Sequence, residues 1–214
     1  MDTDLLTKPL PTRKRVEERI TFEQFCDLID EDQKAHLING VMIMESPASN
    51  IHEELFGFLY TTLRLYVLRK KLGIVRGSRT LIRFSEYSGA EPDFLFVSCA
   101  NLHIVKSQYI DGSPDMIGEI VSSSTRYLDR GKKRKLYAKH GVKEYWLIDP
   151  YRQTTEFLYN HQGNWMPLPI DENGIFRSSA IPGFWLRVDW LFAEELPDGW
   201  EVVNLLIEGV KSSG

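Results

Sequence analysis

The segment from residue 116 to residue 149 constrains the fold of this chain more than any other. Two apolar stretches, residues 116–121 and 144–148, flank a polar stretch over residues 125–140 that is long enough for a helix and is followed by Gly141. Glycine commonly ends helices, because it adopts the left-handed conformation without strain. A strand, a helix and a strand in this order favour a parallel pair with the helix on one face of the sheet. This segment therefore predicts an α/β protein.

A helix and a hairpin are predicted upstream of this segment. Thr21 is a good N-cap for a helix over residues 22–29. Asn39-Gly40 lies between two apolar runs, and this dipeptide suits the type I′ turn of a β-hairpin. The hairpin is expected over residues 36–45.

The stretch after the hairpin predicts a long helix and then short strands. Apolar residues recur at helical spacing over residues 52–72, and Gly73 is expected to end this helix. Apolar runs bounded by Gly, Ser or Pro predict strands at residues 74–75, 80–84 and 93–97. A hairpin extension and further short strands are expected at residues 154–159, 165–168 and 184–188.

Length and composition favour one folded domain. The chain has 214 residues, of which 43% are hydrophobic, so a packed core is feasible. Residues 1–20 mix prolines with charges and predict a flexible N-terminal arm. Residues 21–190 are expected to form the single domain. Residues 191–214 are expected to form an acidic C-terminal segment, because residues 191–210 hold five acidic residues and no Lys or Arg.

Several protein classes are excluded by what the sequence lacks. No GxxxxGK[ST], GxGxxG or GxSxG motif occurs. Cys26 and Cys99 lie far apart and outside any CxxC pair, so neither a disulfide framework nor a thiolate zinc site is indicated. No stretch has the apolar length of a signal peptide core or a membrane span. We therefore expect a cytoplasmic protein without membrane contact.

Two carboxylates are candidate metal ligands. Pro92-Asp93 opens an apolar strand, and Glu119 is the only charge within residues 116–121. A carboxylate inside an apolar strand is costly unless a cation or a hydrogen bond satisfies it. Two such oxygen ligands at one sheet edge can bind Mg²⁺ while water and phosphate fill its other positions. The alternatives are that Glu119 is exposed on an edge strand or paired with a core Arg, and that Asp93 only begins a strand.

Longer stretches resemble a known family. Residues 119–125, 129–137 and 141–150 resemble the Uma-type restriction endonucleases, which are abundant in cyanobacteria and belong to the PD-(D/E)XK nuclease superfamily. Smaller matches follow the same order at residues 37–40, 46–47, 52 and 92–93. The resemblance covers about residues 21–190. It implies a restriction-endonuclease-like core, in which a central mixed β-sheet is flanked by helices, with an N-terminal helix and hairpin and a C-terminal β extension.

The resemblance also implies a metal-dependent DNA endonuclease. Asp93, Glu119 and the backbone carbonyl of Ile120 would hold Mg²⁺, or alternatively Mn²⁺. The superfamily usually has a lysine two positions after the second acid, but this chain has Val121 there. The family's lysine matches Lys133 on the following helix, which would orient the attacking water or stabilise the pentacovalent state.

Two further residues are possible accessories to this site. His52 matches a recurring position of the family and begins the long helix, where a histidine that caps or packs is an equally good interpretation. Tyr137 lies four residues after Lys133 on the same helical face, as a core residue or a hydrogen-bonding buttress.

The distribution of charge favours a nucleic-acid partner. The net charge of −4 excludes a uniformly basic protein. Residues 126–144 nevertheless contain eight basic residues against two acidic ones. This basic island predicts contacts with DNA phosphates, with Arg126, Arg130 and Lys132 as candidates, although a merely solvated helix face explains the same pattern. A homodimer would suit an enzyme that cuts both strands, but the sequence contains no dimer motif.

Two alternatives follow from Val121 and from the acidic C-terminal segment. The protein could be a catalytically inactive, nuclease-like module that binds DNA or another protein, because its lysine has been lost and not moved. It could also be a scaffold whose acidic segment binds a partner. The position of the Lys133 ammonium relative to the two carboxylates separates the first alternative from an active enzyme.

Overall fold

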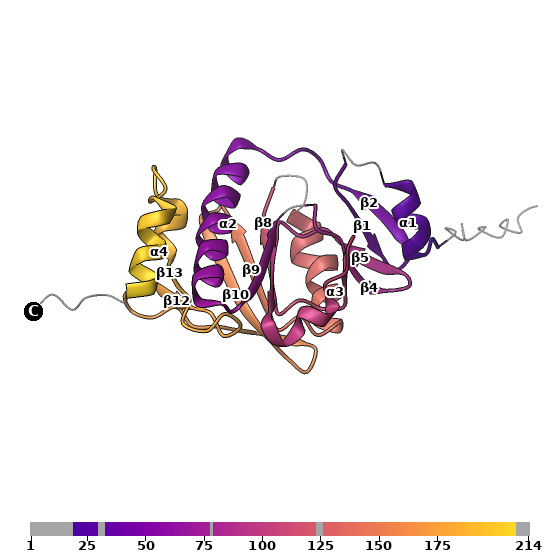
Figure 1. Ribbon diagram of the computed structural model, residues 1–214. Coiled ribbons are helices and arrows are strands. Elements are labelled where there is room, and N and C mark those ends of the chain that lie inside the picture. Colours follow the sequence, from indigo (N-terminus) through magenta and orange to yellow (C-terminus); the bar gives the residue numbers. More distant parts are fainter. Residues whose placement is uncertain (1–18, 30–32, 78, 123–125, 209–214) are drawn as a thin grey trace, which may run out of the picture.

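The computed structural model describes residues 19–29, 33–77, 79–122 and 126–208. Its central element is a six-stranded sheet in the order β11-β10-β9-β8-β6-β3 (Figure 1). Strands β8 and β9 are parallel, with Gly118 opposite Trp146, and the other neighbours in this sheet are antiparallel. The predicted mixed sheet and its parallel pair are thus confirmed. The strands are β3 (Gly73–Gly77), β6 (Phe94–Ser98), β8 (Met116–Ile120), β9 (Glu144–Asp149), β10 (Thr154–His161) and β11 (Asn164–Pro167).

The connection between β8 and β9 is helical, as predicted, but its geometry is mixed. A π-helical stretch, Leu128–Lys133, continues directly into α3 (Arg134–Lys139). Such wider turns occur mostly as single insertions and frequently lie at functional sites. Gly141 follows the helix with φ of 81° and ends it as expected. The expected start at Thr125 lies outside the described residues.

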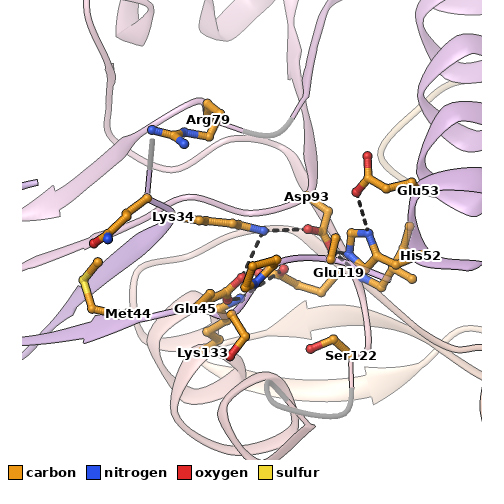
Figure 2. Close-up of a pocket in the computed structure, with 15 residues that line it drawn as sticks. Lys34, Met44, Glu45, His52, Glu53, Arg79, Asp93, Glu119, Ser122 and Lys133 are labelled. Carbon is orange, nitrogen blue, oxygen red and sulfur yellow. Dashed lines mark hydrogen bonds and ion pairs between the residues drawn. The ribbon is translucent and has the colours of Figure 1, made fainter. Parts of the chain in front are cut away.

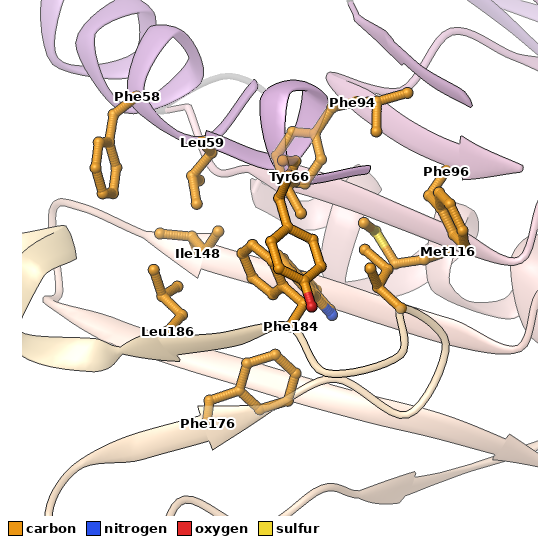
Figure 3. Close-up of a cluster of buried hydrophobic side chains, with 14 of the residues drawn as sticks. Phe58, Leu59, Tyr66, Phe94, Phe96, Met116, Ile148, Phe176, Phe184 and Leu186 are labelled. Carbon is orange, nitrogen blue, oxygen red and sulfur yellow. The ribbon is translucent and has the colours of Figure 1, made fainter. Parts of the chain in front are cut away.

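Two hydrophobic clusters cover the two faces of the central sheet. Successive residues of a strand point to opposite faces, so Phe94 and Phe96 face helix α2 (Asn50–Lys70) whereas Leu95 and Val97 face α3. Figure 3 shows the cluster on the α2 face, where aromatic side chains of the sheet pack beneath the helix.

Helix α2 ends earlier than expected. Lys71, and not Gly73, adopts the left-handed conformation at the helix end, with φ of 55°. The backbone N–H of Leu72 then bonds to the Val67 carbonyl oxygen at 3.0 Å and closes the helix. Gly73 instead begins β3, where a Cβ atom would lie 2.1 Å from the Val97 carbonyl oxygen. The expectation that Gly73 ends the helix was therefore wrong.

The N-terminal part forms a second, smaller sheet beside α3 (Figure 1). Thr21 and Gln24 make a reciprocal capping box for the first helix. Asn39 and Gly40 both have positive φ, 53° and 82°, so the predicted type I′ hairpin is confirmed. The elements are α1 (Phe22–Leu28), β1 (Ala35–Ile38), β2 (Val41–Met44), β4 (Ile82–Ser85), β5 (Ser88–Ala90) and β7 (Ile110–Asp111), in the sheet order β2-β1-β5-β4-β7.

The C-terminal part covers the α2 side of the molecule. Strands β12 (Ile175–Arg177) and β13 (Trp185–Arg187) form a separate hairpin. Helix α4 (Gly199–Glu208) packs against α2 and buries Val202, Val203 and Leu206. Two 3₁₀ turns, Cys99–Ile104 and Val188–Phe192, complete the regular structure. Within the described ranges, no helix is both long and apolar enough to cross a membrane.

Candidate active site

The pairing of β6 with β8 brings the two predicted carboxylates together. Phe94 lies opposite Gly118 in this antiparallel pair, and one further step of the same register places Asp93 opposite Glu119. The Ile120 backbone N–H donates to Asp93 Oδ2 at 2.6 Å, which fixes the Asp93 side chain against the neighbouring strand. Both carboxylates are buried and line a cavity of about 700 Å³ (Figure 2). The sequence-based pairing of Asp93 with Glu119 at one edge of the sheet thus has a geometric basis.

Lys133 reaches Glu119 from the π-helical stretch. Its Nζ lies 3.2 Å from Glu119 Oε2, 2.6 Å from Glu45 Oε1 and 2.9 Å from Asp129 Oδ1. Val121 directly follows β8, two positions after Glu119, and is fully buried in the cluster beneath α3. An apolar side chain therefore packs the core at position 121, while the ammonium arrives from the helix above it.

Tyr137 and His52 hold the two carboxylates from opposite sides. Tyr137 lies one helical turn after Lys133, and its hydroxyl donates to Glu119 Oε1 at 2.6 Å. His52, in the first turn of α2, places Nε2 3.2 Å from Asp93 Oδ2. Burial lowers the pKa of His52, but the hydrogen bond and charge of Asp93 outweigh burial and raise it overall. Both side chains therefore contact the candidate metal-binding carboxylates, and their role as accessories stays a prediction.

The hairpin contributes Lys34 and Glu45, which the sequence reasoning did not identify. These residues flank the base of the β1–β2 hairpin, and the Glu45 N–H bonds to the Lys34 carbonyl oxygen at 2.9 Å. Lys34 Nζ lies 2.6 Å from Asp93 Oδ1 and 3.3 Å from Glu45 Oε2. The sequence did contain a signal for this pair, because Lys34 and Glu45 have opposite charges and lie at equal distances from the Asn39-Gly40 turn. Residues placed in this way face each other across a hairpin.

His36 and Asp129 were also missed. His36 Nε2 contacts Glu45 Oε1 at 2.5 Å, while its Nδ1 accepts the Glu91 N–H at 3.2 Å. Burial, together with the nearby charge of Lys133, lowers the pKa of His36 to about 4, so the ring is neutral near pH ~7 and donates from Nε2. Asp129 precedes Lys133 by four residues, a spacing that favours ion pairs on a helix.

The carboxylates of the site differ in their affinity for protons. Burial raises the pKa of Asp93, but Lys34 and His52 counteract it and hold that pKa well below its ordinary value. Burial likewise raises the pKa of Glu45, and Lys133 lowers it below the ordinary value. For Glu119, burial dominates and raises the pKa to about 8, because the negative charge of Asp93 adds to it and Lys133 only partly compensates. Of these three carboxyl groups, Glu119 is therefore the one for which additional positive charge nearby would do most to favour the ionised form.

This donor set fits a hard divalent cation. Two carboxylates on paired strands provide oxygen ligands of the kind that Mg²⁺ and Mn²⁺ prefer, and the cavity leaves room for water and phosphate. A bound cation would also supply the positive charge that Glu119 needs. No three His, Cys, Asp or Glu side chains in the described ranges form a ready-made ligand group. The Ile120 carbonyl as a third ligand stays a prediction.

The three residues predicted to contact DNA differ in whether their side chains are already paired with carboxylates. Arg130 pairs with Glu156 at 2.5 Å and with Asp149 at 3.2 Å, and Arg126 Nε lies 4.0 Å from Asp149 Oδ2. Arg130 is therefore already engaged by two carboxylates, whereas Arg126 makes one long ion pair. Lys132 is exposed and lines a second cavity, of about 360 Å³, between α3 and the β1–β2 hairpin.

Comparisons with known proteins bear on the fold and the family of this chain. One solved structure, described as "a putative nuclease belonging to DUF820" from Anabaena variabilis ATCC 29413, superimposes with a TM-score of 0.66 and 19% sequence identity. The match covers 81% of this chain and 97% of that chain, and it shows a shared fold. No curated protein matches the chain. The model of the Uma2 family, described as "Putative restriction endonuclease", matches residues 21–189, and the chain therefore belongs to this family.

Proposed function

We propose that this protein is a metal-dependent DNA endonuclease that hydrolyses phosphodiester bonds. The observation that carries the proposal is the position of the Lys133 ammonium, 3.2 Å from Glu119 and in the same cavity as Asp93. The alternative of an inactive protein assumes that the site has lost its lysine, whereas a lysine ammonium lies beside these two carboxylates. Membership of a family described as "Putative restriction endonuclease" supports the same reaction.

Each residue of the site has a distinct part in this reaction. Asp93 and Glu119 hold the cation, and Tyr137 and His52 keep their carboxylates in place through hydrogen bonds. When bound, the cation lowers the pKa of the attacking water and neutralises charge on the scissile phosphate. Lys133 lowers the pKa of Glu119 below the value that burial alone would give, since an adjacent ammonium favours a carboxylate over a carboxyl group.

DNA is the substrate that fits the surface around the cavity. Three exposed lysines line the second cavity, beside the β1–β2 hairpin: Lys132 in the π-helical stretch, and Lys135 and Lys139 in α3. Lysines spaced along one helix face can bind successive phosphates without reading sequence. They lie on the helix that also supplies Lys133, so a backbone bound there passes close to the proposed metal site.

Plasmid cleavage tests the proposal directly. The purified protein is expected to nick or linearise supercoiled plasmid with Mg²⁺ or Mn²⁺ and to leave it intact with EDTA. Glu119→Gln, which keeps the shape but removes a metal ligand, is expected to abolish cleavage. Glu54→Gln, which alters an exposed carboxylate on α2, is the matched control and is expected to cleave like the wild type.

The results also separate the alternatives. Wild-type protein that retains DNA at low salt but never cuts it, under either metal, would identify a DNA-binding module with an inactive site. Protein that neither retains nor cuts DNA would leave a role in protein interaction. Equal cleavage by wild type and Glu119→Gln would point to a contaminating nuclease and refute the assigned site.

A further inference from the structure

Two lysines enter the proposed active site, and they differ in what they can still bind. Lys133 has three N–H donors and three carboxylate neighbours, on Glu45, Asp129 and Glu119, at 2.6 to 3.2 Å. Its side chain is 1% exposed. Glu45 and Glu119 accept hydrogen bonds from the ammonium and Asp129 adds an ion pair, so Lys133 is buried and enclosed by carboxylates where a substrate does not reach it.

Lys34 is the more accessible ammonium. Its side chain is 17% exposed and extends from the base of the hairpin toward Asp93, with Arg79 on the same side of the cavity (Figure 2). Among the described residues its Nζ has two carboxylate partners, Asp93 and Glu45. One of its three donors therefore remains for a further acceptor.

The partners of Lys34 do not depend on it alone. Asp93 also accepts the Ile120 N–H at 2.6 Å and contacts His52 at 3.2 Å. Glu45 also pairs with Lys133 at 2.6 Å and with His36. Rotation about bonds of the Lys34 side chain can therefore move its ammonium without leaving a buried carboxylate unpaired.

Substrate binding favours such a movement. A phosphate in the cavity attracts the ammonium whether or not a cation is present. A divalent cation held by Asp93 would add to this attraction, because it would repel an ammonium that lies 2.6 Å from the same carboxylate. The four-carbon stem of lysine allows the ammonium to turn from one acceptor to the other.

We propose that Lys34 is a substrate-contacting residue whose ammonium binds a phosphate of the DNA strand in the cavity, and that Lys133 is a positioning residue that acts through Glu119 and Glu45. The inference rests on the proposed function and adds a residue to it. It assigns the phosphate contact to the hairpin, whereas the family pattern places the site's lysine on the helix after β8.

Binding measured without metal tests the assignment apart from cleavage. A fluorescent duplex is titrated with protein in EDTA at several salt concentrations, for wild type, Lys34→Met, Lys34→Arg and the control Lys106→Met, which changes an exposed lysine on another surface. Lys34→Met is expected to raise the Kd by about tenfold and to lower the slope of log K against log salt by about 1. Lys34→Arg is expected to restore the slope, because arginine keeps the charge. Lys106→Met is expected to match the wild type.

Cleavage and folding complete the test. With Mg²⁺, single-turnover cleavage by Lys34→Met is expected to fall by about 10²- to 10³-fold, as is typical when one charge-stabilising donor is removed. Its melting temperature is measured alongside, to show that the variant is folded. A wild-type slope and Kd in folded Lys34→Met would overturn the inference, even if cleavage fell, because Lys34 would then only support the carboxylates. Wild-type protein that neither binds nor cuts DNA would instead overturn the proposed function itself.

Discussion

The buried ion cluster around Lys133 makes a strong prediction about stability. Lys133→Met keeps an unbranched side chain of similar length but removes the ammonium that Glu45, Glu119 and Asp129 share at 2.6 to 3.2 Å. Breaking a buried ion pair by removing one partner costs about 3–5 kcal/mol, because the other charge stays buried. In the variant, Glu45 still pairs with Lys34 and Glu119 still accepts from the Tyr137 hydroxyl. The expected cost is therefore that of one broken ion pair and not of three. We expect the free energy of unfolding to fall by about 3–5 kcal/mol near pH ~8.

The loss is expected to depend on pH in a defined direction. The pKa of Lys133 lies well above its ordinary value, because three carboxylates outweigh burial, which alone would lower it. The positive charge of Lys133 is therefore fully present below the ordinary lysine pKa and is lost only as pH rises through the higher folded value, so any change in its contribution at lower pH comes from the carboxylates. Without Lys133 the carboxylates bind protons more readily in the folded state. The difference in the free energy of unfolding between Lys133→Met and wild type is therefore expected to decrease as pH falls from about 8 to about 5.

Urea unfolding followed by tryptophan fluorescence measures this effect, since Trp146 is fully buried. In thermal unfolding the same loss corresponds to a decrease in Tm of about 6–20 °C for a chain of this size. Lys132→Met is the control, because it makes the same change at the exposed neighbouring position and is expected to stay within about 0.5 kcal/mol of the wild type. A loss below about 1 kcal/mol for Lys133→Met would refute the buried, fully paired ammonium.

Three further predictions follow from other contacts. Gly118→Ala places a Cβ 2.0 Å from the ring of buried Phe94, so we expect it to cost about 2–3 kcal/mol of unfolding free energy by overpacking, measured by urea unfolding. Glu144 is fully buried and accepts hydrogen bonds from Trp146 Nε1 and from the backbone N–H groups of residues 179 and 180. Glu144→Ala leaves these donors unpaired and is therefore expected to lower the free energy of unfolding by about 3 kcal/mol, which urea unfolding also measures. The Glu119 pKa of about 8 predicts that Mn²⁺ binding, followed by calorimetry, strengthens about tenfold per pH unit below that value, because the ion binds only the ionised carboxylate.

Each of these three predictions would be contradicted by a different result. A Gly118→Ala variant as stable as the wild type would mean that Phe94 can move aside within the core. For Glu144, an unchanged midpoint would show that water replaces the carboxylate in the loop over residues 178–181. For metal binding, a pH slope that persists unchanged in Glu119→Gln would assign the released proton to another group.

The sequence by itself determined several of the local elements, although not where each strand begins and ends. The Asn39-Gly40 turn, the Thr21 cap and the strand, helix and strand from residue 116 to residue 149 depend on neighbours a few residues apart, and the structure confirms all three. The isolated charge of Glu119 indicated a buried carboxylate because no nearby residue could satisfy it within the strand.

Only the tertiary structure decided which side chains meet in the cavity. Lys34 contacts Asp93 across 59 positions of sequence, and Lys133 contacts Glu45 across 88. These contacts depend on how the N-terminal hairpin packs beside α3, and spacing within one element carries no information about such packing. The same holds for the charges, since Glu119 and Asp93 are both single carboxylates in sequence, yet their surroundings shift their pKa values in opposite directions.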